Sequence, residues 1–183
     1  VGSPQRGPGK LGSALVLDGR DDYVALPEGL MSGLKDFSIA AWVHLDAANG
    51  WARLFDFGND TNVYMFLAPC RNDGGTMRFA IKNGGGEQEV TSSKSVPIGR
   101  WTHLAVTLKT GVATLYIDGR EVGRNPEIAL TPADLGRTVR NFIGKSQYPD
   151  PLLKGRVDDF RIYASALGPG DIAALVGGAP ADP

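Results

Sequence analysis

The sequence predicts an all-β protein, namely an antiparallel β-sandwich with one short helix close to the C-terminal end. Glycine and proline are abundant, with 25 and 12 residues in a chain of 183, and this is typical of many turns between short strands. Apolar residues also alternate with polar residues at a period of two in several short segments. Because the chain is 42% hydrophobic and has the length of one domain, we expect one complete hydrophobic core.

The clearest strands lie at residues 38–46 and 101–109, where aliphatic side chains occupy alternate positions. Residues 113–122 form the clearest hairpin, because Asp118 and Gly119 supply a two-residue turn between alternating segments. The other expected strands lie at residues 14–17, 23–26, 53–57, 64–68, 77–82, 88–92, 141–144 and 157–163, and the expected helix lies at residues 169–176. Many short strands separated by turns indicate a sandwich or a jelly roll.

The two ends of the chain differ in composition from the middle. Residues 1–12 and 177–183 are rich in glycine and proline, which favours flexible segments. We therefore expect one folded domain over residues 13–176, preceded by a flexible segment and followed by a linker. Such ends are typical of a module within a longer polypeptide.

Charge and hydropathy argue against several classes of partner. Lysine and arginine together number 19 and aspartate and glutamate 20, for a formal net charge of -1. The chain therefore lacks the basic excess that is typical of nucleic-acid-binding proteins, and no apolar run reaches the length of a membrane span. We expect a monomer with neither nucleic acid nor membrane as a partner. Cys70 is the single cysteine, so the chain has no internal disulfide.

A set of segments occurs in order along almost the whole chain. The segments are GSALVLDGRDDYVALP at 12–27, FSIAAWVHLD at 37–46, RLFDFGND at 53–60, GRWTHLAVTL at 99–108, ATLYIDGREVG at 113–123, NFIGKSQYPDP at 141–151 and GRVDDFRIYASAL at 155–167. Together they resemble the laminin-G-like, concanavalin A-like superfamily, in the version found as an accessory module of bacterial glycoside hydrolases. The resemblance implies a jelly roll of two curved sheets in which the first and last strands are neighbours.

Acidic residues near the first and last strands suggest a calcium site. Asp18, Asp21 and Asp22 follow the first strand, and Asp158 lies in the last long strand. If the terminal strands are neighbours, as the resemblance implies, the carboxylates converge, and carboxylates and carbonyls are the ligands that Ca²⁺ prefers. By this resemblance we predict a structural Ca²⁺ held by Asp18 and Asp158 with the carbonyl of Gly19. The alternative is that Asp18 and Gly19 form an ordinary turn and that the other acids are solvated.

A second interpretation of Asp158 needs no metal. By strict alternation Asp158 shares a face with Phe160 and Ile162, and a partly buried carboxylate needs a partner. That partner is then Arg156, Arg161 or a backbone amide rather than an ion.

Sugar recognition requires a flat aromatic ring that stacks on a sugar and planar polar side chains that bond adjacent hydroxyl groups. Residues of these kinds that we expect outside the core are Trp51, Asp56, Arg78, His103, Gln147, Tyr148 and Asp150. The sequence leaves open whether they line a groove or only meet solvent. The segment SQYPDP is the strongest candidate, because its two prolines restrict a loop that carries Gln147, Tyr148 and Asp150. We expect Trp42 and Trp101 to be structural, and we expect four phenylalanines to lie in the core: Phe55, Phe57, Phe66 and Phe79.

Motifs for catalysis are missing from the sequence. Neither His44 nor His103 belongs to a recognisable nucleophile or metalloprotease motif, and Cys70 lacks a motif for an activated thiol. A glycosidase needs two carboxylates across the scissile bond, and the strands at 37–46 and 53–58 do not carry such a pair at alternating positions. We therefore expect no independent enzymatic activity.

These observations predict a non-catalytic carbohydrate-binding module of a secreted bacterial glycoside hydrolase. Its expected partners are a carbohydrate polymer and the catalytic domain of the parent enzyme, and its expected location is extracellular. Two other functions stay open at this point. One is a structural module that packs against a catalytic domain without binding sugar, and the other is an adhesion domain that binds protein.

Overall fold

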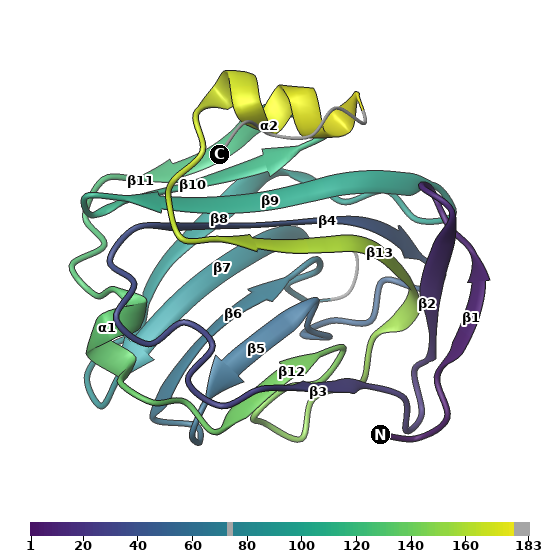
Figure 1. Ribbon diagram of the computed structural model, residues 1–183, viewed down its shortest axis with the longest axis horizontal. Coiled ribbons are helices and arrows are strands. Elements are labelled where there is room, and N and C mark those ends of the chain that lie inside the picture. Colours follow the sequence, from purple (N-terminus) through teal and green to yellow (C-terminus); the bar gives the residue numbers. More distant parts are fainter. Residues whose placement is uncertain (73–74, 178–183) are drawn as a thin grey trace.

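The computed structural model describes residues 1–72 and 75–177 and shows two antiparallel sheets stacked face to face (Figure 1). Within these residues, one sheet has seven strands in the order β1 (Gln5–Pro8), β2 (Ser13–Asp18), β13 (Lys154–Tyr163), β4 (Phe37–Leu45), β9 (Trp101–Lys109), β10 (Val112–Ile117) and β11 (Arg120–Asn125). The other has six, in the order β3 (Val24–Leu26), β12 (Arg140–Ile143), β5 (Phe55–Gly58), β6 (Val63–Ala68), β7 (Thr76–Asn83) and β8 (Gln88–Ser95). The helices are α1 (Pro132–Leu135) and α2 (Pro169–Val176).

The predicted fold class is confirmed, since the chain forms a two-sheet sandwich with a short helix at its C-terminal end. Each expected strand is present within a few residues of its predicted bounds, and the first and last long strands, β2 and β13, pair as neighbours. The sequence did not indicate α1, which is only four residues long.

The N-terminal segment was expected to be flexible, but part of it forms a strand. Residues 1–12 contain β1, which pairs along its whole length with β2. An edge strand needs hydrogen bonds on one side only, so Pro8, which has no backbone N–H, is tolerated there. The sheet therefore begins before residue 13. The expected linker at 177–183 lies outside the described residues, apart from Gly177.

The core lies between the two sheets and is built from alternate positions of their strands. Ile39, Ala41 and Val43 of β4 are buried against Val106 and other side chains from both sheets. Burying each large side chain of this kind stabilises the fold by about 1.5–3 kcal/mol. The opposite side chains of every strand therefore form the two outer faces.

The outer face of the seven-stranded sheet is partly covered by α2, which lies across it near β10 and β11 (Figure 1). Ile172 and Leu175 of the helix form a buried cluster with Tyr116 and with the small residues Ala40 and Ala105, which are paired in register. Small side chains at these two positions leave room for the helix. Among the described residues, no helix is long and apolar enough to cross a membrane.

An irregularity in β13 changes the face of the sheet on which Asp158 lies. The register against β4 shifts between Asp158 and Arg161, so the alternation of the strand is interrupted. Val157 packs in the core before the bulge, and Phe160 and Ile162 pack against the same core after it. The expectation that Asp158 shares their face is therefore wrong, because the bulge inserts an extra position between them.

Candidate functional site

A row of side chains crosses the outer face of the six-stranded sheet. Phe142 of β12, Asp56 of β5, Phe66 of β6, Ala80 of β7 and Glu89 of β8 are directly opposite one another in the strand register. Their neighbours along β5, β6 and β7 point into the core, so this row points away from it. The row forms the base of a candidate site.

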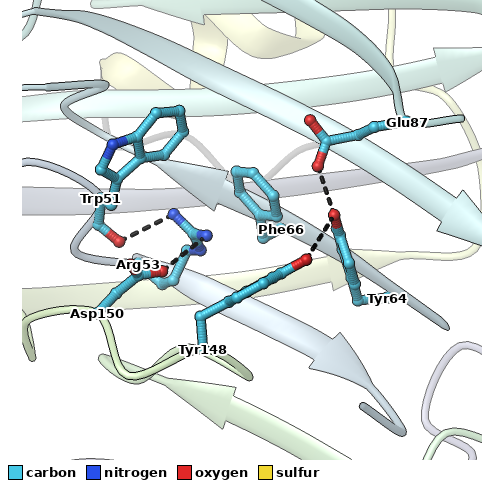
Figure 2. Close-up of a pocket in the computed structure, with 7 residues that line it drawn as sticks. All are labelled: Trp51, Arg53, Tyr64, Phe66, Glu87, Tyr148 and Asp150. Carbon is cyan, nitrogen blue, oxygen red and sulfur yellow. Dashed lines mark hydrogen bonds and ion pairs between the residues drawn. The ribbon is translucent and has the colours of Figure 1, made fainter. Parts of the chain in front are cut away.

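A pocket of about 220 Å³ lies above this row, and Figure 2 shows the side chains around it. Its lining residues are Trp51, Arg53, Tyr64, Phe66, Glu87, Tyr148 and Asp150. They come from the segment before β5, from β6, from the loop before β8 and from the loop between β12 and β13. Three separate loops and one strand therefore build the pocket.

Arg53 lies at the base of the pocket and is only 3% exposed. Its Nη1 donates a hydrogen bond to the carbonyl of Trp51 at 2.8 Å, and its Nη2 lies 3.1 Å from Oδ2 of Asp150. Its Nε lies 3.5 Å from Oδ2 of Asp56, and its guanidinium carbon lies 3.7 Å from the centre of the Phe66 ring. The guanidinium is therefore held in one orientation by four groups, and it fixes the base of the pocket.

Asp56 lies beneath the pocket and is 1% exposed. Its Oδ2 accepts the backbone N–H of Gln147 at 3.0 Å, whereas its Oδ1 has no hydrogen-bond partner. Burial raises the pKa of Asp56 to about 7, against the opposing effects of the Gln147 amide and the Arg53 guanidinium. Burial also lowers the pKa of Arg53. Burial therefore disfavours the charged form of both side chains, and the opposite charge of each one stabilises the charged form of the other.

Two tyrosines form one side of the pocket (Figure 2). The hydroxyl of Tyr64 donates to Oε2 of Glu87 at 2.6 Å, and the hydroxyl of Tyr148 donates to the carbonyl of Thr61 at 3.0 Å. The two rings meet edge to face, with 5.8 Å between their centres. Burial and the bond to Glu87 raise the pKa of Tyr64. The hydroxyl of Tyr148 also lies 3.4 Å from that of Tyr64, whose oxygen is a second acceptor for it. Both hydroxyl groups are therefore engaged within the protein.

Trp51 stands at the opposite side of the pocket from Tyr64 (Figure 2). Its backbone has a φ of 67°, in the left-handed region that non-glycine residues seldom adopt. The N–H of Trp51 donates to the carbonyl of Cys70 at 2.9 Å, and this bond holds the loop in place. The guanidinium carbons of Arg53 and Arg78 each lie 5.7 Å from the centre of the indole ring. These contacts support a ring that is only half-buried.

The loop between β12 and β13 is tied at its base and within itself. The N–H of Leu153 donates to the carbonyl of Gly144 at 3.0 Å and closes the loop. Ser146 donates its hydroxyl to Asp150 at 2.9 Å and accepts the N–H of Tyr148 at 3.0 Å. The loop therefore presents Tyr148 and Asp150 in a preorganised position.

Arg78 extends the polar base of the site toward β8. Its guanidinium forms ion pairs with both Glu87 and Glu89. Arg53 is paired in the same way with two carboxylates, Asp56 and Asp150. Both arginine charges are therefore neutralised within the protein, and the polar groups at this pocket are mostly acceptors.

Of the residues predicted for sugar binding, the structure brings six together and leaves one apart. Trp51, Tyr148 and Asp150 line the pocket, while Asp56 and Arg78 contact its lining residues and Gln147 lies in the same loop. His103 lies on β9, in the other sheet, where it is 2% exposed and its ring centre lies 5.3 Å from that of Trp42. Burial lowers the pKa of His103 to about 4, so its imidazole is neutral at pH 7.

Four pocket residues were not indicated by the sequence: Arg53, Tyr64, Phe66 and Glu87. Phe66 was expected in the core, but it lies on the outer face in a cluster with Tyr64, Ala68 and Ala80. Every residue of β6 is apolar or aromatic, so the strand has no visible alternation. The signal that could have located Phe66 is Asp56 on the neighbouring strand. The residue of β6 that pairs with an outward-facing Asp56 must itself point outward.

The predicted calcium ligands do not converge in the structure. Asp18 is paired with Lys154 in the ladder between β2 and β13, whereas Asp158 lies four positions further along β13, or roughly 13 Å at the usual rise. Asp158 instead accepts the N–H of Leu11 at 2.7 Å, which is the backbone-amide alternative, and Asp18 accepts the N–H of Arg20 at 2.8 Å. The set of Asp18, Gly19 and Asp158 therefore does not fit a single ion.

A smaller acidic cluster remains at the end of β2. Asp18, Asp21 and Asp22 have carboxylate oxygens within 4.8 Å of one another, and Gly19 lies in the same turn. Asp22 is also engaged by the N–H of Ser3 at 2.8 Å. The bond from the Arg20 amide to Asp18 lowers the pKa of that carboxyl.

The chain belongs to the concanavalin A-like lectin/glucanases superfamily, whose laminin-G-like family model matches residues 18–173. No curated protein matches this chain. Among solved structures, domain 4 of AbnA, a GH43 extracellular arabinanase from Geobacillus stearothermophilus in complex with arabinotriose, is 28% identical with a TM-score of 0.84. This match covers 96% of the present chain and 82% of the other.

Two more distant structures share the fold. The CBM40 domain of the Ruminococcus gnavus IT-sialidase, bound to α2,3 sialyllactose, is 13% identical with a TM-score of 0.69, over 86% of this chain and 97% of that one. The binding domain of botulinum neurotoxin serotype C1 is 17% identical with a TM-score of 0.67, over 96% of this chain and 45% of that one. At these identities the likeness concerns the fold alone.

Proposed function

We propose that this protein is a non-catalytic carbohydrate-binding module and that its ligand binds in the pocket on the outer face of the six-stranded sheet. The observation that supports this most directly is the arrangement around Arg53. A half-buried tryptophan and a tyrosine flank a pocket whose base holds polar groups in fixed positions. Aromatic sides and oriented polar groups are what a sugar ring requires.

The likeness to the arabinanase domain supports a role beside an enzyme. That domain was solved with arabinotriose, so arabinose-containing oligosaccharides are the first ligands to test. We propose further that the module belongs to a secreted bacterial glycoside hydrolase and acts outside the cell. In that setting, weak binding to a polymer raises the local concentration of substrate at the tethered catalytic domain.

The acidic residues of the pocket support a binding role rather than hydrolysis. Asp56 is buried, Asp150 is paired with Arg53, and Glu87 accepts the Tyr64 hydroxyl and pairs with Arg78. Each carboxylate therefore already has a partner within the protein. The packing role considered from the sequence would be favoured by an apolar patch, whereas this face presents aromatic and charged groups around a pocket.

Binding is tested by calorimetric titration with arabinan, galactan and mannan and with their oligosaccharides. We expect Trp51→Ala and Tyr148→Ala to weaken binding by about tenfold or more, because each removes an aromatic side of the pocket. Trp101→Ala is the matched control, because Trp101 lies on the seven-stranded sheet, packed against His44. Absence of binding across the panel would overturn the proposal, and turnover of a bound oligosaccharide would overturn its non-catalytic part.

Calcium remains a prediction of the family resemblance, and the cluster of Asp18, Asp21 and Asp22 is the place to test it. We expect Ca²⁺ to raise the melting temperature of chelator-treated protein and Asp21→Asn to remove this increase, because three adjacent carboxylates repel one another without a cation. The Asp171→Asn variant serves as a control, since Asp171 lies at the start of α2. An unchanged melting temperature in wild type at millimolar Ca²⁺ would exclude a structural ion at this cluster.

A further inference from the structure

A second pocket, of about 460 Å³, lies beside the first on the same face of the protein. Tyr148 lines both pockets, so its side chain separates them. The base of the second pocket includes Phe142 of β12, which is directly opposite Asp56 in the sheet register, and Asp56 is in turn opposite Phe66. The two pockets are therefore parts of one continuous row of outward-facing residues.

The second pocket differs from the first in its free polar groups. Arg140 and Lys145 line it, and neither forms an ion pair with a carboxylate among residues 1–72 and 75–177. The ammonium group of Lys145 lies 4.2 Å from the centre of the Tyr23 ring and 5.2 Å from that of Phe142, which holds it over the aromatic base. These two side chains offer N–H donors that no acid has neutralised.

Gln147 provides a further polar group at the second pocket. Its Nε2 donates to the carbonyl of Arg140 at 2.7 Å, so the orientation of the amide is determined. Its Oε1 is buried and has no hydrogen-bond partner. An acceptor that is removed from water without a partner is costly unless a ligand or a water molecule supplies a donor.

We propose that the second pocket is a second subsite, so that the ligand is a chain of at least two sugar residues that crosses Tyr148. This inference rests on the proposed function. One sugar residue meets the acceptor-rich first pocket, and the next meets the donors of Arg140 and Lys145 and the free acceptor of Gln147. Sugar hydroxyls both donate and accept, so a neutral oligosaccharide satisfies both pockets. The rigid loop that carries Tyr148 keeps the two subsites at a constant spacing.

The test is an NMR titration, which measures millimolar affinities, with arabinose, arabinobiose and arabinotriose and with the matching galactose series. In the series that binds, we expect the disaccharide to bind at least about tenfold more tightly than the monosaccharide, because it gains a second set of contacts. Equal affinities would overturn the second subsite and leave the proposed function intact. No binding by either series or by the polymers would overturn both.

Two variants locate the additional contacts. We expect Arg140→Ala and Lys145→Ala to lower disaccharide affinity by about fivefold or more and to leave monosaccharide affinity unchanged. Arg137→Ala is the matched control, because this exposed arginine pairs with Glu28 and lines neither pocket. Melting temperatures confirm that all three variants fold. If Arg140→Ala and Lys145→Ala change mono- and disaccharide affinity equally, or no more than Arg137→Ala does, the assignment of the second subsite is wrong.

Discussion

Replacing Arg53 by methionine is expected to lower the free energy of unfolding by about 3–5 kcal/mol. Methionine fills much of the same volume, so the loss comes mainly from the charge. Without the guanidinium, Asp56 is left 1% exposed with one hydrogen bond, from the Gln147 amide, and no cation beside it. In a domain of this size the same change lowers the melting temperature by roughly 6–20 °C. Urea unfolding and calorimetry measure both quantities.

A double-mutant cycle tests whether the loss of stability comes from the unpaired charge of Asp56. The double variant Arg53→Met, Asp56→Asn removes both charges, so we expect it to be more stable than Arg53→Met alone. Arg137→Met is the exposed control, at 73% side-chain exposure and paired with Glu28 at 2.7 Å, and it is expected to cost less than about 1 kcal/mol. If Arg53→Met is no more destabilising than Arg137→Met, the buried pair does not hold this face together.

Stability is expected to depend on pH through Asp56. The pKa of this carboxyl is about 7 in the folded protein against its ordinary value of 3.8, so between these values the folded state binds more protons than the unfolded state. The contribution of Asp56 to the free energy of unfolding therefore falls as pH rises from about 4 to about 7, and it is constant above pH 7. Unfolding in urea at several pH values measures the effect.

The Asp56→Asn variant separates this group from all others. The wild-type free energy of unfolding minus that of the variant should fall by up to about 1.4 kcal/mol for each pH unit in this window. Asp18 and Asp134 have lowered pKa values, chiefly through hydrogen bonds from the Arg20 amide and from Thr131. Their contribution is therefore lost only below about pH 4, and it cancels in the difference. A difference that stays constant from pH 4 to pH 8 would show that burial does not shift the pKa of Asp56.

The local sequence pattern was sufficient to predict the strands and the loop that forms one side of the candidate site. The alternation at residues 38–46 and 101–109 matches β4 and β9, because a strand with one face in the core must repeat every two residues. The segment SQYPDP lies in a loop, as expected, where its prolines limit the backbone and its polar residues bond within the loop. The sequence therefore pointed to Tyr148, which lines the pocket.

Alternation failed where strands were irregular or wholly apolar. The bulge in β13 moved Asp158 to the outer face, and uniform apolarity concealed the outward position of Phe66. Alternation also could not show whether His103 lies near the pocket. Its position in β9 indicated a face opposite the aliphatic row, but each sheet of a sandwich has such a face, and only the packing shows which sheet carries the pocket.

The sequence by itself determined that this protein is an antiparallel sandwich, because strand periodicity and turn residues are local properties. The pairing of the first and last strands followed only from the family resemblance, since no local pattern shows which distant strands are neighbours. The tertiary structure alone decided which outer face is open, since Ala40 and Ala105 accept α2 on one sheet and leave the other free. It also decided that Arg53, Asp56 and Asp150 meet beneath one pocket. Arg53 and Asp56 lie in one segment, but Asp150 comes from the distant loop between β12 and β13. Its distance from Arg53 depends on strand register and loop closure, neither of which is a property of any single segment.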